Sequence, residues 1–488
     1  MMRWDEEADV VVVGYGGAGA TAAIAAVALG GEALVLEKQS ERRHTPSSFM
    51  GGSQIMAVTG DVEAAARYLD RCAGGMVPKA VSLAWARKAS TVLDWIGTVS
   101  DVRYEPAVGA EHPEFEGAEA IRAHTGPSGG LFIGLQKTAK RHPKEIRVRW
   151  ESPAKRLVRD ANGQVVGVEV AGAGGTKRYG AKKGVILTCG GYEYDEEMKI
   201  NFLKGYPIHF YGNPGNTGDG VRMAQEVGAQ LWHMNSMIGR AIAHFELPDG
   251  SPLNVLASLS GAASLGGIPA DQAPGYVITD RKGKRFANEH MQAMMRHDFY
   301  YLLLEYDPSA NEYTRNPCYW FFDQRRMKLG PPVLTGGGLL SVGYYYWSPG
   351  SEEEIARGWI KRGNSIEEVA AAAGVDPAGA AREIKEYNGA CRAGKDRFGR
   401  PANTMIPLDS PPYYCLPLYP GGSNTSGGPR RNEHAQVVDV FGEPIPGLYE
   451  AGELGEPVGL LYPSNGGNIS DCACFGQIAA EQALASRP

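Results

Sequence analysis

The sequence lacks the features that mark several large classes of protein. It has no dense run of basic residues, and its formal net charge of −6 gives no reason to expect nucleic acid or an anionic membrane as a partner. No apolar stretch approaches the length of a membrane span, and the acidic start of the chain lacks the apolar core of a signal peptide. We therefore expect a cytoplasmic protein with no membrane span and no nucleic-acid partner.

Paired cysteines are missing as well. The seven cysteines are scattered over 488 residues, so a disulfide framework is not expected. Cys472 and Cys474 have no second Cys or His pair nearby, and we interpret them as small buried residues and predict no metal site. We find no internal repeat, and the length allows two or three domains with a sizeable core.

A glycine-rich motif near the start of the chain is the strongest positive signal. Four consecutive valines from Val10 predict a strand buried on both faces. Gly14, Gly16 and Gly19 follow with the G-x-G-x-x-G spacing. The first glycine permits a tight turn, the second lets the backbone approach a diphosphate, and the third brings the next helix close to the strand.

The residues after the glycines complete a dinucleotide-binding unit. An alanine-rich helix is expected over residues 20–29, with its N-terminus facing the phosphates. A second strand, Ala33–Leu36, ends at Glu37, which lies about twenty residues past the glycines, where a ribose diol is usually held. The sequence therefore predicts that a dinucleotide binds here.

The middle and end of the chain indicate which kind of dinucleotide-binding protein this is. Alternating residues over 146–170, with a turn at Asn162-Gly163, predict a meander, and a buried strand then runs to Gly190-Gly191. We expect an α/β fold in which a two-dinucleotide-binding-domain, Rossmann-like FAD domain (1–235 and 401–488) carries an inserted α+β substrate or cap domain (236–400).

The chain resembles the flavoprotein family of fumarate reductases, succinate dehydrogenases and 3-ketosteroid dehydrogenases. The motifs that carry the resemblance span nearly the whole chain: Gly14-Tyr-Gly16-Gly-Ala-Gly19, Glu37, Gly51-Gly52, Thr188-Cys-Gly190-Gly191, Thr217-Gly218-Asp219-Gly220, Gly283-Lys-Arg-Phe286-Ala-Asn288-Glu289, Gly447-Leu-Tyr-Glu-Ala-Gly452-Glu453 and Gly466-Gly467-Asn468. The resemblance implies FAD as the cofactor, bound non-covalently, and a site where the inserted domain closes over the isoalloxazine.

The resemblance also implies roles for individual residues. Glu37 would hold the adenosine ribose, Glu453 the ribityl region, and the backbone near Gly467-Asn468 the pyrimidine edge of the flavin. The predicted cofactor-binding residues are Gly14, Gly16, Gly17, Ala18, Gly19, Glu37, Lys38, Ser48, Gly51, Gly52, Ala154, Gly190, Gly191, Asp219, Glu453, Gly467, Asn468 and Ile469. An alternative is a covalent flavin on His44, since succinate dehydrogenases carry a His-Thr before the second glycine pair.

The branches of this family differ in the substrate that the resemblance implies, so we compare the motifs of this chain with those of each branch. Fumarate reductases use His and Arg side chains to clamp two carboxylates. Here the corresponding places read Asn424-Thr-Ser-Gly-Gly428 and Pro463-Ser-Asn-Gly-Gly467, which disfavours a dicarboxylate. Arg325 and Arg326 fall near the place where that branch keeps its acid, but surface arginines are an equal interpretation.

Tyr462-Pro-x-x-Gly466-Gly467 instead resembles the motif of 3-ketosteroid Δ1-dehydrogenases, and Tyr462-x-Ser464 that of the Δ4-(5α)-dehydrogenases. By this resemblance the Tyr462 hydroxyl and the Gly466 N–H polarise a ketone, Ser464 helps to remove the α-proton, and hydride passes to flavin N5. Neutral donors suit an enolate that develops on an apolar ring.

The tyrosine that would relay the proton is harder to assign. Tyr319 is our first candidate, and Tyr344, Tyr345 and Tyr346 are alternatives. The Δ1 branch often has this tyrosine a few residues after Asn-Glu, but none follows Asn288-Glu289 there.

We therefore predict an FAD-dependent oxidoreductase of CH–CH groups that introduces a double bond next to a ketone in a small apolar cyclic substrate, a 3-ketosteroid first of all, with an unknown electron acceptor or donor. The alternatives are desaturation of a monocyclic ketone and a flavin-dependent ene-reductase of an unsaturated ketone or acid. A flavin-binding structural or sensor protein is the non-catalytic alternative.

Overall fold

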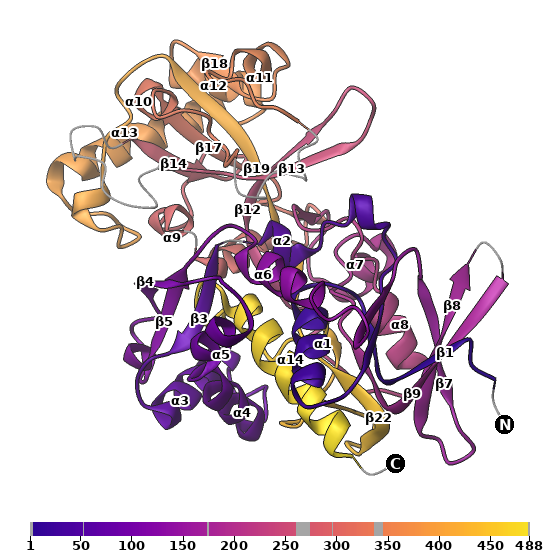
Figure 1. Ribbon diagram of the computed structural model, residues 1–488. Coiled ribbons are helices and arrows are strands. Elements are labelled where there is room, and N and C mark those ends of the chain that lie inside the picture. Colours follow the sequence, from indigo (N-terminus) through magenta and orange to yellow (C-terminus); the bar gives the residue numbers. More distant parts are fainter. Residues whose placement is uncertain are drawn as a thin grey trace. The chain divides into compact units, whose positions relative to one another are not determined.

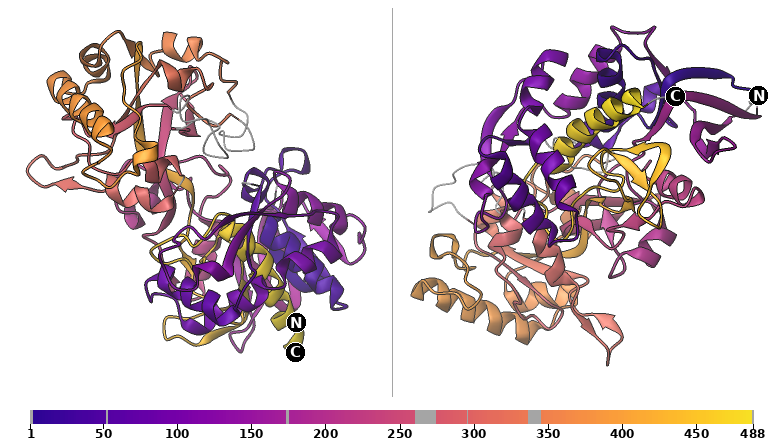
Figure 2. Two further views of the ribbon diagram at one scale, coloured as in Figure 1. Left: turned by 90° about the vertical axis from the view of Figure 1, so that its left-hand side faces the viewer. Right: turned by 90° about the horizontal axis from the view of Figure 1, so that it is seen from below.

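The structure is a computed structural model that describes residues 3–51, 53–172, 175–259, 274–294, 296–335 and 345–486. The chain forms two compact units: the first comprises Met1–Leu203, Gly212–Met237 and Asn424–Pro488, and the second comprises Lys204–Tyr211 and Ile238–Ser423. The N-terminal and C-terminal segments thus belong to the same unit (Figure 2). The sequence interpretation ended the inserted domain at residue 400, whereas the second unit runs to Ser423 because the long strand after residue 412 pairs within its sheet.

The elements of the first unit are, in chain order, β1 (Glu6–Val13), α1 (Gly17–Ala28), β2 (Ala33–Leu36), α2 (Ser47–Met50), β3 (Gln54–Val58), α3 (Val62–Ala73), α4 (Lys79–Ala89), α5 (Val92–Val99), β4 (Glu105–Gly109), β5 (Ile121–Thr125), α6 (Gly130–Ala139), β6 (Ile146–Arg149), β7 (Ala154–Arg159), β8 (Val165–Gly172), β9 (Gly175–Leu187), α7 (Glu196–Phe202), α8 (Asp219–Glu226), β11 (Leu231–Trp232), β20 (Gly428–Pro429), β21 (Gln436–Val438), β22 (Pro444–Glu450) and α14 (Gly467–Ala485).

The elements of the second unit are β10 (His209–Phe210), β12 (Met237–Glu246), β13 (Pro252–Leu256), β14 (Tyr276–Thr279), α9 (His290–Ala293), β15 (Tyr306–Asp307), β16 (Glu312–Tyr313), β17 (Cys318–Asp323), α10 (Gln324–Met327), α11 (Glu352–Ala356), β18 (Lys361–Gly363), α12 (Ile366–Ala373), α13 (Pro377–Ala393) and β19 (Tyr413–Thr425). β12 and β19 each run across a boundary between the units.

The first unit is built on a sheet with the strand order β21-β22-β9-β1-β2-β6, in which β8 also pairs with β9, and β7 pairs with β8. β1 lies in its middle, parallel to both β2 and β9, which explains its run of valines. α1 packs against α14 and α6, and α1 and α14 lie side by side in Figure 1. The predicted α/β fold class is confirmed.

A small antiparallel sheet, β3-β5-β4, completes the first unit. α3 packs on α4, and α14 contacts both α4 and β3 (Figure 1). This arrangement holds the start of α14 against β3: the Met56 N–H donates to the Gly466 carbonyl at 3.1 Å. The N-terminus of α14 is therefore anchored from two sides.

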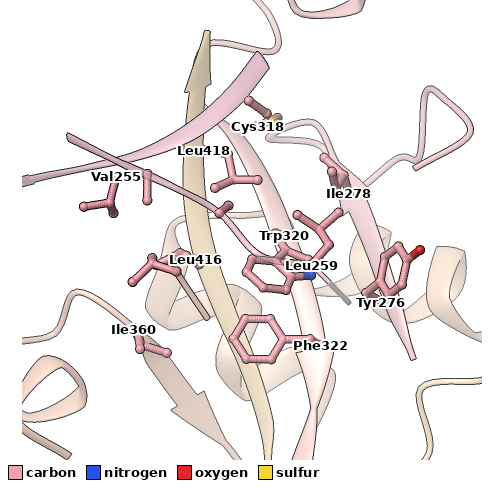
Figure 3. Close-up of a cluster of buried hydrophobic side chains, with 14 of the residues drawn as sticks. Val255, Leu259, Tyr276, Ile278, Cys318, Trp320, Phe322, Ile360, Leu416 and Leu418 are labelled. Atoms are coloured by element: carbon pink, nitrogen blue, oxygen red, sulfur yellow. The ribbon is translucent and has the colours of Figure 1, made fainter. Parts of the chain in front are cut away.

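The second unit has a sheet with the order β13-β12-β19-β17-β14, and β10 and β18 also pair with β19. One face carries a large cluster of buried apolar side chains, with Trp320 and Phe322 of β17 at its centre (Figure 3). On the other face, Tyr319 and Phe321 pack with residues of α12 and α13. The alternation of side chains along β17 thus supplies a core to each face of the sheet.

None of the helices that the structure describes combines the length and the apolar character needed to cross a membrane. All seven cysteines are free, and Cys472 and Cys474 are buried in α14.

Candidate active site

A pocket with about 790 Å³ of empty space, open solvent included, lies in the first unit, along the turn between β1 and α1. Of the predicted cofactor residues, it is lined by Gly14, Gly16, Gly17, Ala18, Glu37, Lys38, Ser48, Ala154, Gly190, Asp219 and Glu453. Gly19, Gly51, Gly191, Gly467, Asn468 and Ile469 do not line it, and Gly52 lies outside the described residues. The structure therefore brings most of the predicted residues around one cavity.

Two glycines of the motif differ in how much space the protein leaves for a side chain. A Cβ atom on Gly19 would stand 2.0 Å from the Gly14 carbonyl oxygen, so this glycine is required by the packing of α1 on the turn. A Cβ on Gly16 would meet its nearest neighbour, the Cβ of Pro46, only at 3.7 Å. The protein itself leaves room at Gly16, which is what a close approach of a diphosphate to the backbone requires.

Glu37 closes one end of the pocket. Its carboxylate accepts hydrogen bonds from the backbone N–H groups of Tyr15 at 2.9 Å and Gln39 at 2.8 Å. Burial acts to raise the pKa of Glu37, but hydrogen bonds from His44 and from these two N–H groups prevail, and the pKa is lowered. An ionised, pre-oriented carboxylate at this end suits the diol of a ribose.

His44 lies beside this carboxylate. Its Nε2 atom is 3.5 Å from Glu37 Oε2, and its ring stacks on Tyr15 and meets Trp150 edge-on. The resemblance puts the flavin ring at Gly467-Asn468 and the ribose at Glu37. His44 therefore lies beside the carboxylate that we predict to hold the ribose, and a covalent flavin on His44 stays the alternative prediction.

A buried carboxyl pair lies at the Glu453 end of the pocket. Glu193 and Glu453 hydrogen-bond to each other, and the Asn216 amide donates to Glu193 at 3.2 Å and to Glu453 at 3.1 Å. Burial and mutual repulsion raise the pKa of Glu193, and burial raises that of Glu453. Burial thus favours the neutral form of both carboxyl groups, which limits the negative charge at this part of the pocket.

Sequence reasoning missed Glu193 and Asn216. Glu193 follows the Thr-x-Gly-Gly motif by two residues, and Asn216 directly precedes Thr217 of the Thr-Gly-Asp-Gly motif. Gly191, which was predicted, contributes by donating its N–H to Glu453 at 2.9 Å. The sequence signal that could have indicated them is their position as polar residues directly beside these two motifs.

The start of α14 holds the predicted catalytic tyrosine. The Tyr462 hydroxyl accepts a hydrogen bond from the Asn468 backbone N–H at 2.8 Å, and its ring lies against Gly467, where a Cβ would be 3.0 Å from the ring. In the amide orientation that satisfies both of its polar atoms, the Asn468 side chain also donates to Tyr462 at 2.9 Å and to Glu456 at 2.9 Å. Tyr462 is therefore held by two donors at a helix N-terminus.

Ser464 and Gly466 complete this segment. Ser464 is fully buried, and its hydroxyl has no hydrogen-bond partner in the described part of the chain. Gly466 has φ +82°, and a Cβ there would stand 2.5 Å from the Cα of Ile55. The turn that presents Tyr462 thus needs glycine, because both conformation and space exclude a side chain.

The other catalytic candidates lie in the second unit. Tyr319 is 7% exposed in the cluster beneath α12 and α13, and its hydroxyl pairs with the Arg281 side chain. Tyr345 donates to Glu354, Tyr346 is exposed, and Tyr344 lies outside the described residues. The relay role of Tyr319 stays a prediction, and its surroundings are those of a packed core residue.

Arg325 and Arg326 are held in structural contacts. Arg325 binds the carboxylates of Asp323 and Asp409. Arg326 is fully buried and donates to the carbonyls of Ser258 and Pro331. Burial lowers the pKa of Arg326 to about 9. The structure gives Arg326 the place of a core arginine, not that of a surface residue.

Arg431 connects α14 to the central sheet of the first unit. It pairs with Glu450 of β22 at 3.3 Å and with Asp471 of α14, and its guanidinium lies 3.9 Å from the Phe475 ring centre. All these groups are fully buried. Burial raises the pKa of Asp471 to about 6, even though Arg431 acts to lower it.

Arg431→Leu is expected to lower the free energy of unfolding of the first unit by about 3–5 kcal/mol, because it leaves buried carboxyls without their cation. Urea denaturation of the FAD-bound protein measures this. Arg178→Leu is the matched control: Arg178 pairs with Glu169 at 2.7 Å while 50% exposed, so a loss of no more than about 1 kcal/mol is expected. Equal losses in both variants contradict the role given to Arg431.

Glu37→Gln is expected to weaken FAD binding about 10- to 100-fold, because the amide cannot accept from both N–H groups and loses the negative charge. Release of fluorescent flavin on dilution measures the effect. Glu32→Gln is the control at the other end of β2, where Glu32 pairs with Arg147 while 51% exposed. Unchanged flavin retention in Glu37→Gln shows that this carboxylate does not hold the cofactor.

The glycine turn, the acid after the second strand and the pocket that joins them define a flavoprotein with a dinucleotide-binding fold. The chain belongs to the family of the FAD binding domain, whose profile matches residues 9–469. The predicted family, the FAD cofactor and the oxidoreductase class are thereby confirmed.

Two sequence relatives have names that indicate opposite reactions, a reduction and a dehydrogenation. Digoxin reductase of Eggerthella lenta is 26% identical over 524 aligned positions, which cover 99% of this chain and 88% of the relative. The 4-oxocyclohexanecarboxylate 2-dehydrogenase of Sinomonas cyclohexanicum is 28% identical over 345 positions, which cover 66% of this chain and 54% of the relative.

The fold is also that of a solved steroid enzyme. The crystal structure of 3-ketosteroid Δ1-dehydrogenase from Sterolibacterium denitrificans, in complex with 1,4-androstadiene-3,17-dione, aligns with a TM-score of 0.83 over 99% of this chain and 100% of that chain. The sequence identity is 21%, so this likeness concerns the fold.

Proposed function

We propose that this FAD-dependent oxidoreductase introduces a C=C bond next to the ketone of a cyclic substrate. The substrate loses a proton from the α carbon and a hydride from the β carbon. Bound FAD supplies the acceptor for the hydride. The protein's own task is to stabilise the enolate and to take the proton.

The setting of Tyr462 is the observation that carries the proposal. Its oxygen accepts hydrogen bonds from the Asn468 N–H and from the Asn468 amide, at the N-terminus of the 19-residue helix α14. Both donors and the helix dipole favour negative charge on this oxygen. A tyrosine so placed becomes a stronger donor to a ketone oxygen as enolate charge develops.

Ser464 supports a role in proton removal. Its buried hydroxyl has no competing partner among the described residues, and an unsatisfied buried hydroxyl calls for a functional or ligand-related reason. We assign it the α-proton, passed on through a tyrosine. The Gly466 N–H donates no hydrogen bond to the described residues, and we assign it to the ketone oxygen beside Tyr462.

The ring system that we propose first is a 3-ketosteroid, on the strength of the Tyr462-Pro-x-x-Gly-Gly motif. The 4-oxocyclohexanecarboxylate relative supports a monocyclic ketone as the other member of the same class.

A reductase that runs in the opposite direction is the second candidate. The support is the digoxin reductase relative, whose alignment covers 99% of this chain. The same neutral donors would stabilise the enolate formed when an unsaturated ketone is reduced.

Anaerobic bleaching of the bound flavin by a panel of saturated steroid and monocyclic ketones tests the proposal. Bleaching by a saturated ketone supports desaturation, and reoxidation of the dithionite-reduced protein by an unsaturated ketone alone supports the reductase. A flavin that no ketone in either series changes rejects both candidates.

A further inference from the structure

Tyr68 of α3 is a fully buried tyrosine whose hydroxyl binds a distant part of the chain. It donates to the backbone carbonyl of Pro463, 395 positions further on, at 2.6 Å. The hydroxyl in turn accepts from the backbone N–H of His112 at 3.2 Å. Burial raises the pKa of Tyr68, so the hydroxyl keeps the proton that it donates. The side chain therefore connects α3 to the residue between Tyr462 and Ser464.

The Pro463 carbonyl accepts from a second donor. The backbone N–H of Glu111 lies 3.1 Å from this oxygen, so both of its lone pairs are engaged. Because a peptide group is planar, the direction of this carbonyl also fixes the plane that ends at the Cα atom of Ser464. The orientation of the Ser464 backbone is thus set by two donors, of which Tyr68 is the side chain.

The residue before Tyr462 is bound to the same end of α3. The Leu461 N–H donates at 3.0 Å to the carbonyl of Cys72, which lies in the last turn of the helix, where carbonyls have no partner inside the helix. Gly459 packs against Ala73, where a Cβ on the glycine would stand 2.1 Å from the carbonyl oxygen. Tyr462 therefore lies between two residues whose backbone is held on α3.

The position of the Ser464 side chain depends on this support of its backbone. Its buried hydroxyl has no hydrogen-bond partner in the described part of the chain, so the side chain follows the backbone that carries it. That backbone is held before Ser464 by the donors to Pro463, and after it by the Gly467 N–H, which donates to the Ser464 carbonyl at 3.0 Å. A shift of the Pro463 peptide would therefore move the Ser464 hydroxyl.

The Cys72 thiol is another group near the Tyr68 hydroxyl. Cys72 lies one helical turn after Tyr68, and the two side chains interact. A thiol is a weak hydrogen-bonding group, whereas 2.6 Å to the Pro463 oxygen is a short O–H···O distance. The carbonyl is therefore the main acceptor of the Tyr68 proton.

We propose that Tyr68 is a positioning residue, which holds the Pro463 peptide so that the hydroxyls of Tyr462 and Ser464 keep a fixed separation. The proposal rests on the function proposed above, in which Tyr462 acts on the ketone oxygen and Ser464 on the α-proton. The two hydroxyls must reach different atoms of one substrate together, and small displacements of such groups are costly in rate. Tyr68 acts through the peptide that lies between them.

Anaerobic stopped-flow measurement of the flavin absorbance with the preferred ketone tests the proposal. Tyr68→Phe is expected to lower the rate constant about tenfold, with full amplitude and normal flavin content, because one well-placed hydrogen bond is lost and the ring is kept. A merely structural role would instead lower the amplitude or the flavin content and leave the rate constant of the remaining sites unchanged.

Tyr300→Phe is the matched control. Tyr300 is 2% exposed, and its hydroxyl donates to the backbone carbonyl of Lys204 at 3.1 Å, within the second unit. This variant loses the same kind of hydrogen bond and is expected to keep the rate constant of the unmodified protein. Equal rate constants in Tyr68→Phe and Tyr300→Phe overturn the proposal.

Replacement of Tyr68 by 4-aminophenylalanine tests whether the donor is what matters. The amino group keeps an N–H donor at the same place on a ring of the same size, so this variant is expected to recover most of the rate constant. A rate constant as low as that of Tyr68→Phe shows that donation to the Pro463 carbonyl is not the cause, and it contradicts the proposal.

Hydrogen exchange of the backbone amides over residues 459–467, in the FAD-loaded protein, separates this proposal from the proposed function. Tyr68→Phe is expected to raise these exchange rates at least about threefold, and Tyr300→Phe is expected not to change them. If no ketone changes the flavin but the exchange rates rise in this way, the proposed reaction is wrong and the contact of Tyr68 with this segment stands. If ketones react and Tyr68→Phe changes neither the rate constant nor the exchange rates, the reaction stands and the role given to Tyr68 is wrong.

Discussion

Tyr462→Phe is expected to keep FAD bound and to lower kcat about 10²- to 10³-fold with the preferred ketone, the loss typical of removing one donor that stabilises an oxyanion. The phenylalanine ring keeps its contact with Gly467, so the start of α14 is preserved. Only the hydroxyl that receives the Asn468 N–H is lost. The measurement is dye-linked oxidation in steady state, with flavin content taken from visible absorbance.

Tyr387→Phe is the matched control for this substitution. Tyr387 is 1% exposed in the cluster beneath α12 and α13, and its hydroxyl interacts there with the Cys391 thiol, a weak hydrogen-bonding group. Removing that hydroxyl is expected to leave kcat unchanged. Full activity in Tyr462→Phe rules out the proposed oxyanion role, and a loss of flavin in that variant indicates that the hydroxyl serves α14 instead.

The local part of the cofactor fold could be predicted because its causes are local. The valine run, the glycine spacing and Glu37 led to β1, α1, β2 and several of the residues that line the pocket. Each of these features is dictated by neighbours in the chain. The start of α1 differed from the expectation, since the helix begins at Gly17 and not near Ala20.

Other elements depended on groups that a periodicity does not show. Residues 79–96 have helical spacing in the sequence, but the structure has two helices there, α4 and α5, and between them the hydroxyls of Ser90 and Thr91 donate to the carbonyls of Arg87 and Lys88. Residues 100–130 show no regular spacing in the sequence, but β5 forms there by pairing with the distant β3. A strand that depends on a remote partner carries little signal of its own.

The charged groups of the candidate site were the least predictable part. Glu193 and Glu453, 260 positions apart, have raised pKa values only because the fold buries them together. Such pairings follow from tertiary packing, not from motif spacing.

Alanine at two glycines of the first turn is expected to separate folding from cofactor binding. Gly19→Ala is expected to destabilise the first unit by at least about 3 kcal/mol and to abolish FAD binding, because the new methyl would stand 2.0 Å from the Gly14 carbonyl oxygen. A backbone oxygen inside the turn cannot move aside as a flexible side chain does. The measurements are urea denaturation and flavin content after purification.

Gly16→Ala is expected to behave differently. Gly16 has φ −90° and ψ −161°, which any residue can adopt, and the methyl would meet protein atoms only at 3.7 Å and beyond. The free energy of unfolding of the cofactor-free protein is therefore expected to change by less than about 0.5 kcal/mol. FAD affinity is expected to fall about 10- to 100-fold, because the methyl occupies space beside the diphosphate.

Gly109→Ala on β4 is the neutral comparison, since a methyl group added at this exposed position would have no neighbouring atom within 4 Å. If Gly16→Ala retains FAD as well as Gly109→Ala does, the diphosphate does not lie against Gly16, and the pocket must hold the cofactor differently. If Gly16→Ala is as unstable as Gly19→Ala, the open space at Gly16 belongs to the folding of the turn. The contrast between the two glycines therefore tests the cofactor position independently of any assay of the reaction.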